Sequence, residues 1–258
     1  MSQTVPGSRA NLPALKRRAR RLSRAEGIPL HAALDRLAQA EGFARWSLLA
    51  ARAAGDAPGA DAAGPLANAV PPPLDQAVFP RLSAGDRLLL AGRPGQGKTL
   101  IGLRLLLDAA REGRRATFYT LDWTQAETRA RLHALAGPDA GLAEAPEIMA
   151  CDDIDAERIE ADLAAGPRGA VAAIDYLQLL DQRRSTPPLE AQVSALAAFA
   201  RRSGAILAFL SQIDRAWRPE SAPTPSLAHL RRPNPFPVEA FSHACFIHGG
   251  AMRFHDLP

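Results

Sequence analysis

The segment from Gly92 to Thr99 has the residue types and the spacing that bind phosphate. It reads GRPGQGKT, so two glycines five residues apart lead into Lys98 and Thr99. Glycine lets the backbone turn tightly and direct N–H groups at phosphate oxygens. Lys98 is placed to reach the β- and γ-phosphates of a nucleotide, and the Thr99 hydroxyl to bind Mg²⁺. We therefore predict a site for ATP or a close relative, made by consecutive residues: Gly92, Arg93, Pro94, Gly95, Gln96, Gly97, Lys98, Thr99 and Leu100.

Polar residues follow the apolar runs that we expect to form a parallel sheet. The runs, which are separated by helical patterns, cover residues 87–91, 116–121, 170–174 and 205–210. Ligands of open parallel sheets bind at the carboxyl ends of the strands. The residues that come just after these runs are therefore candidates for the same site: Gly92, Asp122, Asp175, Ser211 and Gln212.

Three of these side chains suit the chemistry of a nucleotide. Asp175 is the natural partner of Mg²⁺, directly or through water, and its alternative role is a helix cap or turn residue. Thr124 and Glu127 make a capping box for the next helix, which leaves Asp122 available to orient an attacking water. Asp122 is alternatively a simple turn residue. Gln212 is placed to sense the γ-phosphate, or else is a surface amide.

The chain divides into three parts by composition. Residues 1–53 predict a small module of three short helices, and residues 54–73 predict a linker rich in Ala, Gly and Pro. Residues 74–258 alternate apolar strands with helices and end in a hairpin that turns on Gly249 and Gly250. The expected architecture is α/β, with a mainly parallel sheet behind a helical module.

Charge is unevenly distributed along the chain. The first 53 residues hold ten basic and three acidic residues, whereas the whole chain carries a net charge of +4. The basic residues between Lys16 and Arg24 fall on one helix face, which would either contact nucleic-acid phosphates or simply face solvent. Two cysteines in 258 residues argue against a disulfide framework, and no apolar run is long enough to span a membrane. We expect a cytoplasmic protein that makes no contact with membranes.

Four segments together resemble replicative DnaB-type helicases, which belong to the RecA-like P-loop ATPases. The resemblance covers about residues 76–248, and its last two motifs are more specific than the phosphate loop. The segments follow the family's order: SAGDRLLLAGRPGQGKT (83–99), ATFYTLDWTQAETRARL (116–132), AAIDYLQLLDQ (172–182) and ILAFLSQIDR (206–215).

The resemblance implies a RecA-like core in which each matching residue has a role. Lys98 and Thr99 would bind phosphate and Mg²⁺, and Asp175 would be the acidic metal residue. Gln212 would couple the nucleotide state to bound DNA. The resemblance also implies single-stranded DNA as a partner and a ring of head-to-tail subunits.

The sequence departs from the family in three respects. Asp122 stands where the family has a catalytic glutamate, so the carboxylate is one methylene further back and hydrolysis is expected to be slow. The family's arginine finger lies in sequence beyond the hairpin, and Arg215, Arg218 or Arg253 could substitute. The basic module stands where the family has a large N-terminal helical domain.

The sequence thus predicts an ATP hydrolase that works on DNA, as a helicase-like motor of DNA replication or its accessory. An alternative is a regulatory module that binds DNA or protein according to its nucleotide and hydrolyses little ATP. A small-molecule kinase with the same phosphate loop is a third interpretation, which the motifs IDYLQLL and LSQIDR disfavour.

Overall fold

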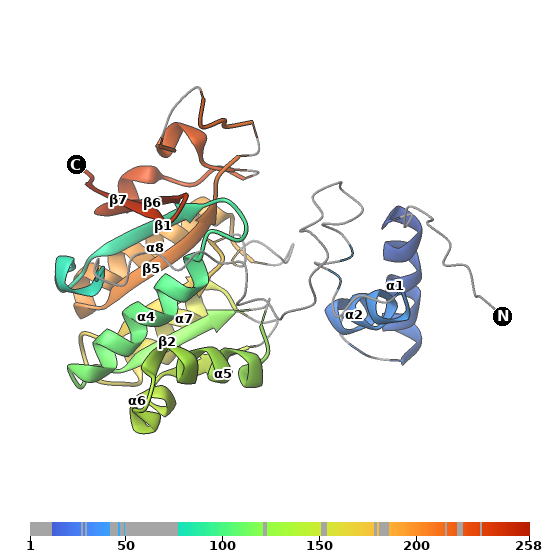
Figure 1. The fold of residues 1–258 in the computed structure, drawn as a ribbon, viewed down its shortest axis with the longest axis horizontal. Helices are drawn as coiled ribbons and strands as arrows, with labels where there is room; N and C mark the ends of the chain where they lie inside the picture. Colours follow the sequence, from blue (N-terminus) through green and yellow to red (C-terminus); the bar gives the residue numbers. More distant parts are fainter. Residues whose placement is uncertain are drawn as a thin grey trace. The chain divides into compact units, whose positions relative to one another are not determined.

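The computed structural model describes the chain in ranges: 12–26, 28, 30–41, 46, 49, 77–120, 123–150, 154–177, 180, 186–214, 216–220, 224–232 and 234–258. The chain forms two compact units, residues 1–64 and 65–258. We describe each unit by itself. Figure 1 shows both units, with the sequence coloured from blue to red.

The first unit contains two helices, α1 (Leu12–Glu26) and α2 (Leu30–Ala40). Leu15 and Ala19 of α1 are buried, as the helical spacing of apolar residues predicted. Where the structure describes basic side chains of α1, it places them in solvent: Arg17, Arg18 and Arg21 are exposed. The predicted third helix is described only at residues 46 and 49, and both are helical. The predicted linker, residues 54–73, lies outside the described part of the chain.

The second unit is built on a seven-stranded sheet in the order β3-β2-β4-β5-β1-β6-β7. Neighbouring strands are parallel, except that β7 is antiparallel to β6. The strands are β1 (Arg87–Gly92), β2 (Ala116–Thr120), β3 (Glu147–Met149), β4 (Val171–Asp175), β5 (Ile206–Gln212), β6 (His243–His248) and β7 (Ala251–Asp256).

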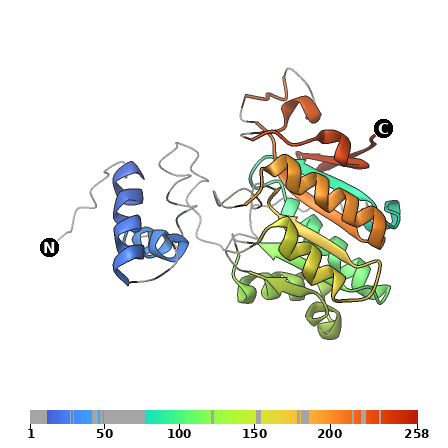
Figure 2. The same cartoon turned by 180° about the vertical axis from the view of Figure 1, so that it is seen from behind.

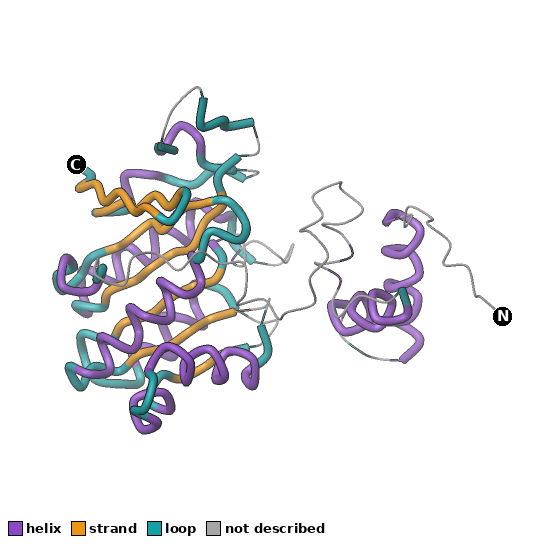
Figure 3. Tube along the Cα trace, in the orientation of Figure 1, coloured by secondary structure: helices purple, strands orange, loops and turns teal. Residues whose placement is uncertain are grey.

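Helices cover both faces of the sheet, as Figures 1 and 2 show from opposite sides. One face packs against α4 (Lys98–Arg111), α5 (Gln125–Ala136) and α6 (Ala140–Glu144). The other face packs against α7 (Ala156–Ala164) and α8 (Leu189–Ser203). Figure 3 shows the resulting three layers of helix, strand and helix. Short 3-10 helices cover Phe79–Arg81, Leu227–His229 and Val238–Ala240.

The predicted α/β pattern is confirmed, with small shifts at the strand ends. Asp175 and Gln212 were predicted just beyond their strands, but each is the last residue of its strand. The sequence prediction did not include β3, which has only three residues. The predicted hairpin is confirmed: Gly249 (φ 56°) and Gly250 (φ 78°) join β6 to β7 in the left-handed conformation that glycine favours.

A polar cluster fixes β6 and β7 beside the start of β1. The His243 ring bonds Asp86 at 3.0 Å and Asp256 at 2.9 Å, and the Ser242 hydroxyl donates to Asp86 at 2.9 Å. Because these residues lie at the amino end of β1, they hold the hairpin in place without occupying the opposite edge of the sheet. No helix in the described part of the chain is long and apolar enough to cross a membrane.

Candidate functional site

The loop between β1 and α4 has the conformation that a phosphate-binding loop requires. Gly95 (φ 77°) and Gly97 (φ 83°) are left-handed, and Gly97 caps the helix that begins at Lys98. A Cβ atom at Gly92 would lie 3.0 Å from the carbonyl oxygen of Ile247, which explains why a side chain is disfavoured there. The helix therefore directs its N-terminal N–H groups and its positive dipole end toward the space above the loop.

Lys98 is folded back onto the loop that carries it. Its Nζ atom donates to the carbonyl oxygens of Gly92 and Arg93, each at 2.9 Å. Burial lowers the pKa of Lys98 to about 8, and the charge of Asp175 acts in the opposite direction. An anion bound in the loop would favour the charged ammonium further.

Thr99 and Asp175 meet at the carboxyl edge of the sheet. The Thr99 hydroxyl donates to Oδ2 of Asp175 at 2.6 Å, and Asp175 is only 6% exposed. Alternation along β4 explains the contact, because Ala172 and Ile174 pack under α7 and α8 while Asp175 faces α4. A hydroxyl and a carboxylate so placed are the oxygen ligands that Mg²⁺ prefers.

Gln212 lies two strands away from Asp175's partner β2, directly opposite Gly92 in the register of β1 and β5. Its side-chain oxygen accepts a hydrogen bond from Arg231 at 3.1 Å, and its carbonyl accepts from the Arg231 N–H at 2.8 Å. Gln212 thus joins the edge of the sheet to the segment that follows β5.

Asp122 lies outside the described residues, but both of its flanks are described. Thr120 is buried at the end of β2, paired in register with Asp175. On the other side, the Arg131 guanidinium carbon lies 3.5 Å from the centre of the Trp123 ring. The predicted capping box of Thr124 and Glu127 is also present. The described backbone on either side of Asp122 is therefore anchored.

Sequence reasoning missed two residues that contact the site, Arg231 and Trp217. Each lies in the irregular segment after β5, where no periodic pattern signals its partner. Arg231 bonds Gln212, and Trp217 lies beside Arg93 of the loop, with the guanidinium carbon 5.2 Å from its ring centre. Neither contact follows from spacing in the sequence.

The three arginines predicted as substitutes for a finger are not brought together. Arg215 lies outside the described residues. Arg218 is exposed and donates to the Trp217 carbonyl at 3.3 Å, whereas Arg253 is exposed on β7.

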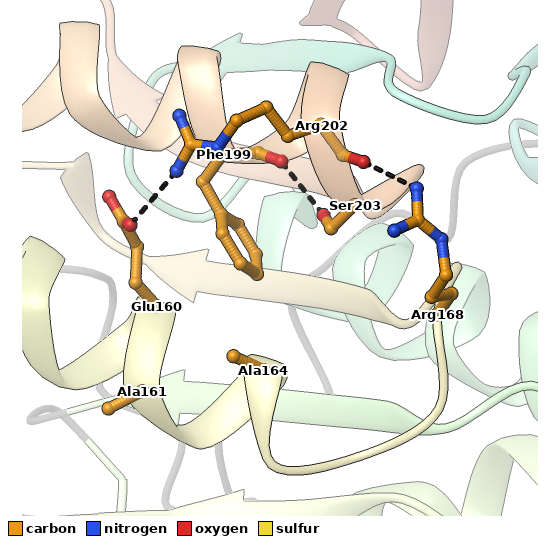
Figure 4. A pocket seen from close by; sticks show the side chains of 7 residues that line it. All are labelled: Glu160, Ala161, Ala164, Arg168, Phe199, Arg202 and Ser203. Atoms are coloured by element: carbon orange, nitrogen blue, oxygen red, sulfur yellow. Dashed lines mark hydrogen bonds and ion pairs between the residues drawn. The ribbon is translucent and has the colours of Figure 1, made fainter.

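An open cavity of about 360 Å³ lies between α7 and α8, away from the phosphate loop. Figure 4 shows the Phe199 ring between the two helices, with Arg202 reaching toward Glu160. The cavity lies at the carboxyl end of α8, which directly precedes β5, so it belongs to the opposite edge of the sheet. Its described lining includes no residue that the sequence predicted for the site.

Solved structures with a similar fold exist among helicase proteins. One is the ATPase domain of a DnaB-like helicase, which matches with a TM-score of 0.52 and 19% identity, over 66% of this chain and 74% of the other. Another is titled "The Structure Of A DnaB-Like Replicative Helicase And Its Interactions With Primase" and matches with a TM-score of 0.51 and 19% identity. That match covers 63% of this chain and 47% of the other, so this chain spans less than half of that protein.

No protein-family model and no curated protein matches the sequence. The likeness to the two structures therefore concerns the fold. The chain has an α/β fold similar to the ATPase domains of DnaB-like replicative helicases, in agreement with the resemblance of its motifs.

Proposed function

We propose that this protein binds ATP with Mg²⁺ and hydrolyses it in work on DNA, as a helicase-like motor or its accessory. The observation that carries the proposal is the bond of 2.6 Å between Thr99 and Asp175, beside Lys98 at the start of α4. Residues 76 positions apart meet at the edge where a parallel sheet binds its ligands.

The residues at this edge fit a magnesium nucleotide. Thr99 and Asp175 would hold Mg²⁺, directly or through water, and the loop N–H groups would hold the phosphates. Bound Mg²⁺ neutralises the charge that develops on the phosphate oxygens during transfer.

Lys98 has the role of following the charge of the phosphates. In the structure its ammonium is held by two loop carbonyls, which are neutral acceptors. Phosphate oxygens are stronger acceptors because the bond is then charge-assisted on both sides. We expect Lys98 to exchange the carbonyls for the β- and γ-phosphates when the nucleotide binds.

Asp122 is the residue proposed to orient the attacking water. Its anchored flanks, at Thr120 and at Trp123, favour a fixed position for the backbone there. The short carboxylate would then stand about 1 Å behind the place of a glutamate, which slows hydrolysis.

DNA is the proposed macromolecular partner, by resemblance of the motifs and by the position of two arginines. Arg231 and Arg232 are exposed, and Arg231 is bonded to Gln212 at the edge of the nucleotide site. Phosphates of a single strand bound there would be close to the group proposed to sense the γ-phosphate. The basic residues of α1 offer a second surface for nucleic acid. A head-to-tail ring of subunits is part of the same proposal.

A second candidate function is a nucleotide-gated binding module with little hydrolysis. Asp122 in place of glutamate favours it, because a module that only binds has no need of an efficient water-positioning group. Lys98, Asp175 and Gln212 favour the motor.

The test is steady-state ATP hydrolysis with and without single-stranded DNA, with Lys98→Ala as the blank. Calorimetry measures ATP binding in parallel, and light scattering follows the size of the particle with and without ATP. We expect slow hydrolysis that DNA stimulates and that Lys98→Ala abolishes. Hydrolysis at the level of Lys98→Ala, whatever DNA is added, would refute the motor and leave the binding module as the function.

A further inference from the structure

Arg93 connects the phosphate loop to a tryptophan that lies far away in the sequence. Its guanidinium carbon is 5.2 Å from the centre of the Trp217 ring, and its Nη2 atom donates to the Trp217 carbonyl oxygen. The carbonyl of the same Arg93 accepts one of the hydrogen bonds of Lys98. Arg93 is thus bonded at one end to the lysine expected to bind phosphate and at the other end to Trp217.

Trp217 is held firmly by packing. It is 3% exposed, and its ring makes an edge contact with His248 at the end of β6, with 4.8 Å between the ring centres. A second edge contact, at 6.3 Å, is with His229. The indole Nε1 is buried and has no hydrogen-bond partner among the described residues. Ring contacts therefore position the side chain, and these contacts include the guanidinium of Arg93.

The loop has a further contact with the same part of the chain. The side-chain oxygen of Gln96 accepts a hydrogen bond of 2.8 Å from the N–H of Gly249, in the turn between β6 and β7. The phosphate loop is therefore attached through Arg93 and Gln96 to segments that come after β5.

The contacts of Trp217 lead onward to the edge residue Gln212. The His229 carbonyl accepts a hydrogen bond of 2.7 Å from the Asp214 N–H, and Arg231, two residues later, bonds Gln212. A displacement of the Trp217 ring would press on His229 and so on the short stretch that carries Arg231. This connection runs beside the direct one through the Gln212 side chain.

We propose that Trp217 is a positioning residue for the phosphate loop, and that Arg93 transmits nucleotide binding from the loop to Trp217 and the segment after β5. The inference rests on the proposed binding of ATP. Phosphate anions compete with the neutral carbonyl and ring of Trp217 for the Arg93 guanidinium, because charge-assisted hydrogen bonds are the stronger ones. When Lys98 turns toward phosphate, the Arg93 carbonyl also loses its bond and the peptide can shift.

The emission of Trp217 provides the test. Trp46→Phe and Trp123→Phe together leave Trp217 as the single tryptophan of the full chain. We expect MgATP to change its emission in a saturable way, with the same midpoint as ATP binding measured by calorimetry. Arg93→Ala should still bind ATP through the rest of the loop but lose most of the emission change, and Arg93→Lys should restore part of it.

Arg218→Ala is the matched control. Arg218 donates to the same carbonyl of Trp217 at 3.3 Å, but it does not belong to the phosphate loop. Its replacement should leave the emission change intact. If circular dichroism shows that the double Phe variant is unfolded, the Trp217 signal is obtained by subtracting the emission of Trp217→Phe from that of the natural chain.

The outcomes separate this inference from the proposed function. If calorimetry detects no ATP binding, the proposed function fails and the inference fails with it. If ATP binds while the emission stays constant, or if Arg93→Ala gives the full change, the connection through Arg93 is refuted and ATP binding stands.

Discussion

Replacing Thr99 by valine separates the hydroxyl of the metal site from its shape. Valine keeps the branched side chain but loses the donor that lies 2.6 Å from Asp175. A hydrogen bond to a charged group contributes about 1.5–3 kcal/mol to stability. The Asp175 carboxylate is buried, so water replaces the lost donor poorly and we expect a loss within this range. For a protein of this size each kcal/mol lowers Tm by about 2–4 °C, which gives a decrease of about 3–12 °C for Thr99→Val.

Scanning calorimetry of the nucleotide-free protein measures this decrease, and Thr99→Ser is the matched control. Serine keeps the hydroxyl and loses one methyl group, so its Tm should remain close to that of the natural chain. The double-mutant cycle with Asp175→Asn then measures how strongly the two side chains depend on each other. An unchanged Tm for Thr99→Val, or an equal decrease for Thr99→Ser, would contradict the assignment of stability to this hydrogen bond.

The same variants report on the metal. Saturating ligand at about 100 times its Kd stabilises a protein by about 2.7 kcal/mol. We expect Mg²⁺ to add to the stabilisation by ATP in the natural chain and in Thr99→Ser, but not in Thr99→Val. Equal effects of Mg²⁺ in all three proteins would argue against Thr99 as a ligand.

Three further predictions concern the charged groups. The pKa of Lys98 is lowered to about 8 in the free protein, and bound phosphates raise it; ATP binding should therefore take up a proton above pH 8 and weaken as pH rises. Calorimetry at about pH 8.5, just above that pKa, in buffers of different ionisation enthalpy measures this uptake, which Lys98→Ala should abolish. Asp122→Glu should raise kcat by about tenfold or more if distance limits the water-positioning group, and an unchanged kcat would remove Asp122 from that role. Arg232→Ala should reduce the slope of log affinity for single-stranded DNA against log salt by about 0.7, the value for one phosphate contact; an unchanged slope would place the strand elsewhere.

The phosphate loop and the strands could be predicted because their signals are local. GRPGQGKT carries its last two glycines where the backbone is left-handed, and each long buried strand is a short apolar run. The meeting of Thr99 with Asp175 also followed, since parallel strands bring their carboxyl ends to one edge. Strand ends were harder to predict, because Asp175 and Gln212 are polar residues that still pair within the sheet.

The contacts of Trp217 and Arg231 could not be predicted for the opposite reason. Both residues lie in irregular chain, where no period indicates the direction of a side chain. Arg93 and Gln212, which they contact, are distant in the sequence or separated from them by irregular chain. Likewise β3 has three residues, too few for alternation to distinguish a strand from a loop.

The strand order also has a consequence for how the protein is made. Strand β1 lies between β5 and β6, where Arg87 pairs with Leu207 and Leu88 pairs with His243. Chains are synthesised from the amino end, and long-range pairings form late in folding. On the ribosome, the phosphate loop is therefore complete in sequence long before both of its neighbouring strands exist. The growing chain carries an apolar strand without partners during this interval, when it is most exposed to aggregation and has greatest need of chaperones.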